Sequence, residues 1–204
     1  MKRVVCALVL SLVLTSALNP ALAQGREPEA LVRETSEQML AMLKEQHDVI
    51  AAEPGRLYGL VYEIVLPHFD FERMSRWVLG KHWRQATPEQ QQAFVDQFRN
   101  LLVRTYGAAL REYTDQNIVY LPVRRSADSK EVIVRTEVMK PGGVPIPIHY
   151  SMYLSADGWK VYDVIIDGVS LVSNYRTNFA TEIRNAGLEG LIKRLADRNA
   201  QGAT

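Results

Sequence analysis

Hydrophobic residues in the first half of the chain recur at intervals of three and four positions, a spacing typical of amphipathic helices. Three helices are expected before residue 80, and Pro54-Gly55 and Pro67 separate them because proline cannot continue a helix. The third follows Asp70, a residue type that caps helices, and stops before Gly80. These helices are expected at residues 29–52, 57–66 and 71–79.

The clearest start of a helix is Thr87-Pro88-Glu89-Gln90. Thr87 can cap the helix, Pro88 suits the first helical position, and Gln90 can reach back to complete a capping box. The apolar residues that follow share one helical face and predict a long amphipathic element. They are Phe94, Phe98, Leu101, Leu102, Tyr106, Ala109, Leu110 and Tyr113.

After residue 116 the hydrophobic pattern alternates with a period of two, which predicts strands. Short sequences rich in Gly, Asp and Ser separate the strands and favour an antiparallel meander. Its four strands are expected at residues 117–125, 131–140, 146–155 and 158–166.

Helical spacing returns after the turn residues Asp167-Gly168. Ser170 stands at the junction and most simply caps the following helix, which Gly187 should interrupt. The polar tail beyond Arg198 is expected to be mobile. Helices, then a meander, then helices again predict an α+β fold.

Residues 1–23 have the three-part pattern of a cleavable signal peptide. Lys2 and Arg3 precede the apolar run 4–14, and Ala21-Leu22-Ala23 is a small-x-small cleavage site. The run is shorter than the ~20 apolar residues that a membrane span requires. Cys6 lies inside it rather than at the cleavage site, which disfavours a lipoprotein. We therefore expect an exported, periplasmic protein with a single domain at residues 24–204.

Removal of this signal peptide leaves 181 residues without cysteine, so a hydrophobic core rather than disulfides must stabilise the domain. These residues contain 22 Lys and Arg against 23 Asp and Glu, a net charge of −1. Nucleic acids and anionic membrane surfaces usually require a basic surplus, so neither partner is indicated, although a local basic patch stays open. No further apolar stretch in the sequence is long enough to span a bilayer.

The candidate chemical groups do not form a pattern typical of an enzyme. None of the histidines has a partner at a metal-ligand spacing; they are His47, His68, His82 and His149. Ser170 could be a nucleophile, but no histidine follows it in the chain. Asp163 and Asp167 would lie about 13 Å apart along a strand, too far to share a proton. We expect no catalytic residue, metal or cofactor, and an envelope hydrolase using these side chains stays an alternative.

Three groups of motifs, in one order along the chain, carry a resemblance to a known family. The first runs from Val78-Leu79-Gly80 through Ala86-Thr87-Pro88 to Thr105-Tyr106-Gly107. The second joins residues 159–164 to 168–172, and the third joins 175–179 to 187–191. Over residues 30–197 the sequence resembles the MlaC or toluene-tolerance family of periplasmic phospholipid-binding proteins.

The resemblance implies helices wrapped on a curved, mostly antiparallel four-stranded sheet, similar to the nuclear-transport-factor shape, with an apolar cavity for acyl chains. It also implies a monomeric carrier that maintains outer-membrane lipid asymmetry. The implied partners are phospholipid, an inner-membrane ABC transporter with an MCE-domain protein, and an outer-membrane lipoprotein–porin complex. A scaffold or interaction protein without a ligand cavity is the alternative.

Candidate lipid-binding residues combine the expected helix and strand faces with the family motifs. Each could equally be an ordinary core residue, and no basic residue can be named for the head group. The candidates are Trp77, Leu102, Tyr106, Leu110, Ile148, Tyr150, Met152, Val164, Ile166 and Val169.

Overall fold

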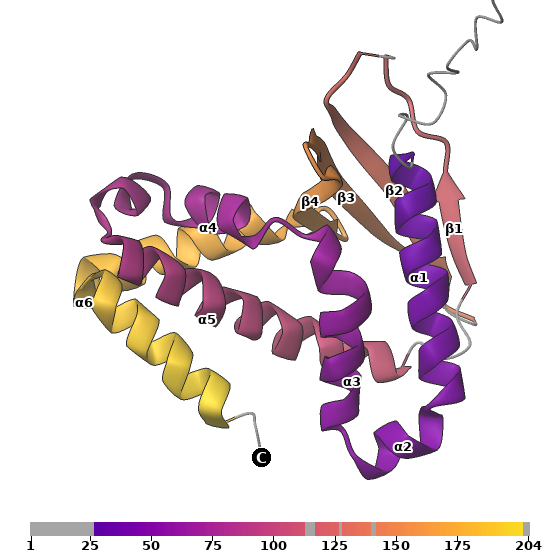
Figure 1. Cartoon of the computed structure of the whole chain (residues 1–204), viewed down its shortest axis with the longest axis horizontal. Coiled ribbons are helices and arrows are strands. Elements are labelled where there is room, and N and C mark those ends of the chain that lie inside the picture. The colour runs from indigo at the N-terminus through magenta and orange to yellow at the C-terminus, as the bar shows by residue number, and fades with distance from the viewer. Residues whose placement is uncertain (1–26, 113–116, 127, 140–141, 202–204) are drawn as a thin grey trace, which may run out of the picture.

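The computed structural model describes residues 27–112, 117–126, 128–139 and 142–201, so the expected signal peptide at 1–23 lies outside the described residues. A sheet occupies one side of the molecule, and helices extend alongside it and away from it (Figure 1). This arrangement confirms the α+β class. Among the described helices, none is long and apolar enough to cross a membrane.

The N-terminal helical region is more divided than the sequence predicts. It comprises α1 (Pro28–Glu45), α2 (His47–Ala52), α3 (Gly55–Leu60), the π-helical segment η2 (Val61–Val65) and the 3-10 segment η3 (Leu66–His68). The single helix expected at 29–52 is interrupted at Gln46, whose backbone is not helical (φ −101°, ψ 20°). The second expected helix changes its hydrogen-bonding pattern as it approaches Pro67.

Both predicted helix caps are present. Asp70 accepts a 2.8 Å hydrogen bond from the Arg73 backbone at the start of α4 (Phe71–Leu79). Thr87 and Gln90 form the reciprocal capping box of α5 (Pro88–Gly107), at 3.1 and 3.2 Å. The 3-10 segment η4 (Gly80–Gln85) connects these two helices.

The long helix ends earlier than the apolar pattern predicts. The α-helical part of α5 stops at Gly107, and the 3-10 segment η5 (Ala108–Glu112) continues it; Tyr113 lies outside the described residues. Glycine is a poor helix former, and the Tyr58 ring lies 3.5 Å from where a Gly107 side chain would begin. Close packing therefore accompanies the change of helix type.

The sheet is the predicted antiparallel meander, in the order β1-β2-β3-β4-β5. Its strands are β1 (Asn117–Leu121), β2 (Glu131–Met139), β3 (Ile146–Ser155), β4 (Gly158–Ile166) and β5 (Val169–Ser170). The prediction that the first strand reaches Arg125 is wrong, because Pro122 has no N–H with which to continue the ladder.

The expected count of four strands is also wrong, because a short fifth strand follows the fourth. Asp167 and Gly168 both have positive φ (49° and 79°), the backbone of a tight two-residue hairpin turn. Val169 therefore pairs with Ile166, and Ser170 with Ile165. A turn was expected here, but its reversal of the chain was not.

The C-terminal helix α6 (Leu171–Gln201) is kinked at Gly187 (φ 73°, ψ 173°), which confirms the predicted interruption. The predicted mobility beyond Arg198 is wrong as far as Gln201, because the helix continues to that residue. Asn199 is buried, and its amide donates to the Gln97 backbone carbonyl at 3.0 Å and to the Gln97 side chain at 2.9 Å. These bonds attach the end of α6 to α5.

Two hydrophobic clusters share α5. The larger lies between one face of the sheet and helices α4, α5 and α6, and includes Phe98, Val134 and Met152. The smaller joins α1, α2, α3 and η2 to Val103 of α5. Figure 1 shows α5 running from the α4–α6 region toward α3, as this sharing requires.

Candidate functional site

The face of the sheet that points into the larger cluster is here called the inner face. Strand pairing places Tyr120, Thr136, Ile148 and Ile166 in one row across β1 to β4. Alternating side chains of β2 are buried on this face, while those between them, such as Ile133, are exposed on the opposite face. The neighbouring row continues the apolar surface with Val134, Tyr150 and Val164.

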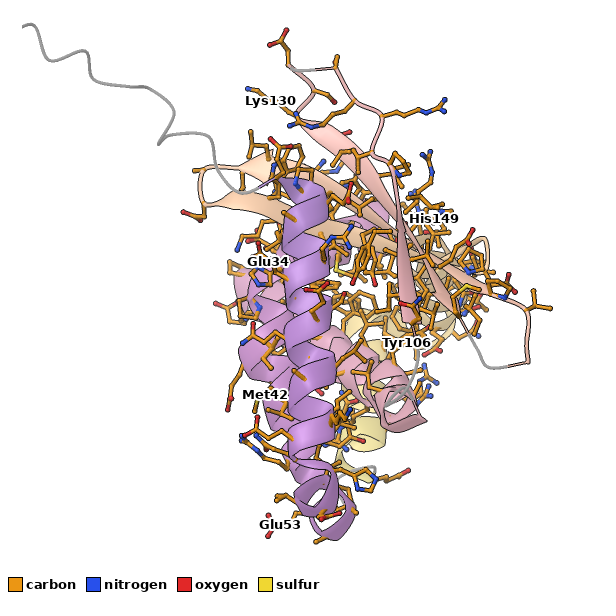
Figure 2. All side chains as sticks on the ribbon, turned by 90° about the vertical axis from the view of Figure 1, so that its right-hand side faces the viewer. Glu34, Met42, Glu53, Tyr106, Lys130 and His149 are labelled. Carbon is orange, nitrogen blue, oxygen red and sulfur yellow. The ribbon has the colours of Figure 1, made fainter. Side chains whose placement is uncertain are left out.

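Seven of the ten candidate residues meet in the larger cluster. Two come from α5 and five from the sheet: Leu102, Tyr106, Ile148, Tyr150, Met152, Val164 and Ile166. Some are fully buried, and others are only partly buried at the edge of the cluster. Figure 2 shows Tyr106 between the end of α5 and the strands. The long helix and the sheet therefore face each other across these side chains, as the candidate site requires.

The other three candidates lie elsewhere. Leu110 packs against the smaller cluster, beside α1 and α3. Trp77 on α4 is 48% exposed, and Val169 in β5 is 54% exposed. Both residues therefore lie at the surface: the Trp77 ring stands 5.3 Å from the Tyr162 ring of β4, and Val169 pairs with Ile166 at the end of that strand.

Tyrosines line the interior between the helices and the sheet. Burial raises the pKa of Tyr150 to about 12, although a side-chain hydrogen bond with Thr136 acts in the opposite direction. Burial also raises the pKa of Tyr106 to about 12, and the charge of Tyr175 and a hydrogen bond with it contribute to this rise. Burial is the main cause that raises the pKa of Tyr120. The interior is thus apolar but contains hydroxyl groups.

Two of these tyrosines, Tyr120 and Tyr175, were absent from the predicted set. Tyr175 packs edge-on against Phe98 at 5.3 Å and joins the aromatic cluster beneath the sheet. Tyr120 lies in the same row as Ile148. The alternation of β1 could have placed Tyr120 on this face, but the short, half-exposed strand carries a weak pattern.

A separate surface pocket of about 420 Å³ lies at the start of α4, lined by Asp70, Glu72, Arg73, Arg76, Trp77 and Tyr153. The Arg73 guanidinium stacks 4.0 Å from the Tyr153 ring and 4.5 Å from the Tyr162 ring, and it pairs with Glu131 at 2.8 Å. This pocket is charged and open, unlike the apolar interior that contains most candidates.

Ser170 has the capping role that the sequence predicts, and Asp163, considered in the sequence only as a candidate carboxylate for catalysis, supports that cap. The Ser170 hydroxyl accepts from the Ser173 backbone at 3.1 Å and donates to Asp163 at 2.6 Å. Asp163 also accepts from the Val172 backbone at 3.1 Å. Both side chains are thereby engaged with the first turn of α6. Among the described residues, no group of histidine, cysteine or carboxylate side chains could hold a metal ion.

Comparison with known proteins identifies relatives along almost the whole described chain. Residues 33–197 match the family model described as MlaC protein. The toluene tolerance protein ttg2D of Pseudomonas putida is 30% identical over 177 residues, which cover 86% of this chain and 82% of that protein. The intermembrane phospholipid transport system binding protein MlaC of Haemophilus influenzae is 25% identical over 198 residues, covering 95% and 92%.

A solved structure with the same fold contains a ligand. It is the phospholipid-binding protein from Ralstonia solanacearum in complex with a phospholipid, at 1.53 Å resolution. That protein is 37% identical to this one, and the superposition has a TM-score of 0.81. The match covers 88% of this chain and 100% of the Ralstonia chain.

Proposed function

Because the chain belongs to the MlaC protein family, we propose that it is a phospholipid-binding carrier of an intermembrane transport system and not an enzyme. The observation that carries this proposal is the Ralstonia structure, in which a protein of the same fold holds a phospholipid. The name of the Haemophilus relative supplies the intermembrane transport role. The capping role of Ser170 and Asp163 agrees with a protein that binds without chemistry.

The cost of exposing acyl chains to water explains why a carrier is useful where phospholipid crosses an aqueous gap. Two acyl chains contain roughly 30 methylene groups, and their exposure to water costs on the order of 24 kcal/mol at ~0.8 kcal/mol each. An apolar protein interior offsets most of this cost without covalent chemistry. Such a site needs an apolar lining with a few polar groups that orient the ligand.

The inner face of the sheet and the facing side of α5 supply this lining in our proposal. Leu102 and Tyr106 approach from the helix, and Ile148, Tyr150 and Ile166 from the strands. The acyl chains lie between these elements, in a cavity whose volume depends on how far α5 and the sheet separate. Several of these residues are partly buried rather than sealed in the core, which supports a lining role.

The cellular setting extends the same proposal. The carrier operates in the periplasm after removal of residues 1–23, as a single domain. It receives and delivers phospholipid at an outer-membrane lipoprotein–porin complex and an inner-membrane ABC transporter with an MCE-domain protein, and so maintains outer-membrane lipid asymmetry. The system membership of the Haemophilus relative supports this setting.

Native mass spectrometry of the purified protein tests the proposal directly, because a carrier should retain phospholipid. Ile148→Trp adds bulk on the inner face and should abolish the bound lipid. Ile133→Trp adds the same bulk in the adjacent strand, but on the face where the native side chain is 40% exposed, and should leave the lipid in place. Lipid-free wild-type protein, or equal loss in both variants, would contradict the proposal.

A further inference from the structure

One hydroxyl group on the inner face lacks the partner that burial normally demands. The Tyr120 hydroxyl oxygen is inaccessible to solvent, and no group in the described part of the chain makes a hydrogen bond of normal geometry with it. Ser36 of α1 lies close enough to lower the pKa of Tyr120, but it does not complete such a bond. Buried polar groups are almost always paired, so this hydroxyl requires an explanation.

An arginine lies directly above the same ring. The Arg33 guanidinium of α1 stands 4.0 Å from the centroid of the Tyr120 ring. Its side chain is 42% exposed, and one Nη donates to Glu29 at 2.9 Å in an i,i+4 pair. Pairs of this kind on a helix surface are weak, and the bond to Glu29 uses one of the five N–H donors of a guanidinium.

These two groups stand at the end of an apolar row. From Tyr120 the row passes through Thr136 to Ile148 and Ile166, and Thr136 is satisfied because its hydroxyl donates to the Ile148 carbonyl at 2.8 Å. Along this path an exposed cation is followed by a buried donor and then by apolar side chains. A glycerophospholipid has the same order of groups: phosphate, ester carbonyls, acyl chains.

We infer that the Tyr120 hydroxyl and the Arg33 guanidinium form the polar end of the lipid site, binding an ester carbonyl and the phosphate of a glycerophospholipid. The inference rests on the proposed function and adds the orientation of the ligand. The ester carbonyls accept hydrogen bonds and donate none, so they complement a buried donor without a partner. The phosphate complements a guanidinium that is held in place by an aromatic ring.

The test removes one polar group from the protein and its counterpart from the ligand. Full-length protein is stripped of lipid and titrated with three probes that carry the same hydrocarbon chains: a diacyl phosphatidylglycerol, its ether-linked analogue without ester carbonyls, and a diacylglycerol without phosphate. Tyr120→Phe should weaken binding of the diacyl phospholipid about tenfold and leave the ether lipid unchanged. Arg33→Gln should weaken both phospholipids about tenfold or more and leave diacylglycerol unchanged.

Matched control variants make the same chemical changes elsewhere. Tyr62→Phe removes a hydroxyl that donates to Asn100 at the surface, and Arg76→Gln breaks another i,i+4 pair, with Glu72. Both should bind all three probes like the wild type. The unfolding midpoint of lipid-free Tyr120→Phe should equal or exceed that of the wild type, because the variant loses only an unpaired buried hydroxyl.

The outcomes separate this inference from the proposed function. A wild-type protein that binds neither phospholipid overturns both. If the wild type binds both phospholipids but the variants either bind all three probes like the wild type or bind all three equally more weakly, only the inference is overturned. A lower unfolding midpoint for Tyr120→Phe would show that the hydroxyl has a partner within the protein, and it too would overturn the inference.

Discussion

Asp163→Ala should destabilise the protein strongly, although it lies outside the proposed lipid site. The Asp163 carboxylate accepts from the Ser170 hydroxyl at 2.6 Å and from the Val172 N–H at 3.1 Å. It thereby connects β4 to β5 and to the positive end of the α6 helix dipole. Hydrogen bonds to a charged group contribute about 1.5–3 kcal/mol each when buried, and Asp163 is half-buried. We therefore expect a loss of about 2–4 kcal/mol.

This loss corresponds to a fall of about 5–15 °C in the unfolding midpoint of a domain of this size. Urea denaturation followed by circular dichroism measures the loss in the free energy of unfolding. Asp157→Ala is the control, because Asp157 is exposed in the β3–β4 turn and its loss should change stability by less than about 0.5 kcal/mol. An Asp163→Ala protein with wild-type stability but no lipid transport would refute the structural role and revive a chemical one.

The remaining predictions concern single local features. Thr87→Ala removes the cap of α5 and should cost about 1 kcal/mol in urea denaturation, with the helix otherwise intact. Gly80→Ala should cost about 1–3 kcal/mol, because the Gly80 backbone (φ 55°, ψ −119°) lies in a region that residues with a side chain rarely adopt. The contribution of Tyr106 and Tyr150 to the free energy of unfolding should be constant up to pH 10 and should fall between pH 10 and about 12. In that interval the phenol groups lose their protons in the unfolded chain but retain them in the folded protein, because folding raises their pKa. The slope in that interval is at most about 1.4 kcal/mol per pH unit for each tyrosine and is smaller for the partly exposed Tyr106, and phenolate absorbance follows the same ionisations; a stability that is flat across the interval would contradict the assignment.

Local sequence signals predict local structure well in this chain. The capping box at Thr87, the cap at Asp70 and the interruption at Gly187 all depend on residues within one helical turn of each other. The meander follows from alternation and short turns, which are also local. These features form because a few neighbouring residues decide the hydrogen bonds involved.

Some of the features that the sequence failed to predict depend on contacts between distant segments. Asn199 orders the end of α6 by bonding to Gln97, which lies about a hundred residues earlier in the chain. The fifth strand is an exception, because the two-residue turn at Asp167 and Gly168 that brings Val169 back to β4 is local. The α-helical part of α5 ends at Gly107, where the ring of Tyr58, from a distant segment, packs closely against the backbone.

The candidate site shows the same limit in a different form. Apolar periodicity identified Leu102, Ile148 and Ile166, but periodicity cannot distinguish a cavity lining from a sealed core, since both are apolar. Polar atoms carry the distinction, because a core rarely leaves a buried donor without a partner. Tyr120 and Arg33 lie about 90 residues apart in sequence, and only the packing of α1 on β1 brings them together. The proposed orientation of the lipid therefore depends on the fold, whereas the apolar faces proposed to hold its chains are already present in the sequence.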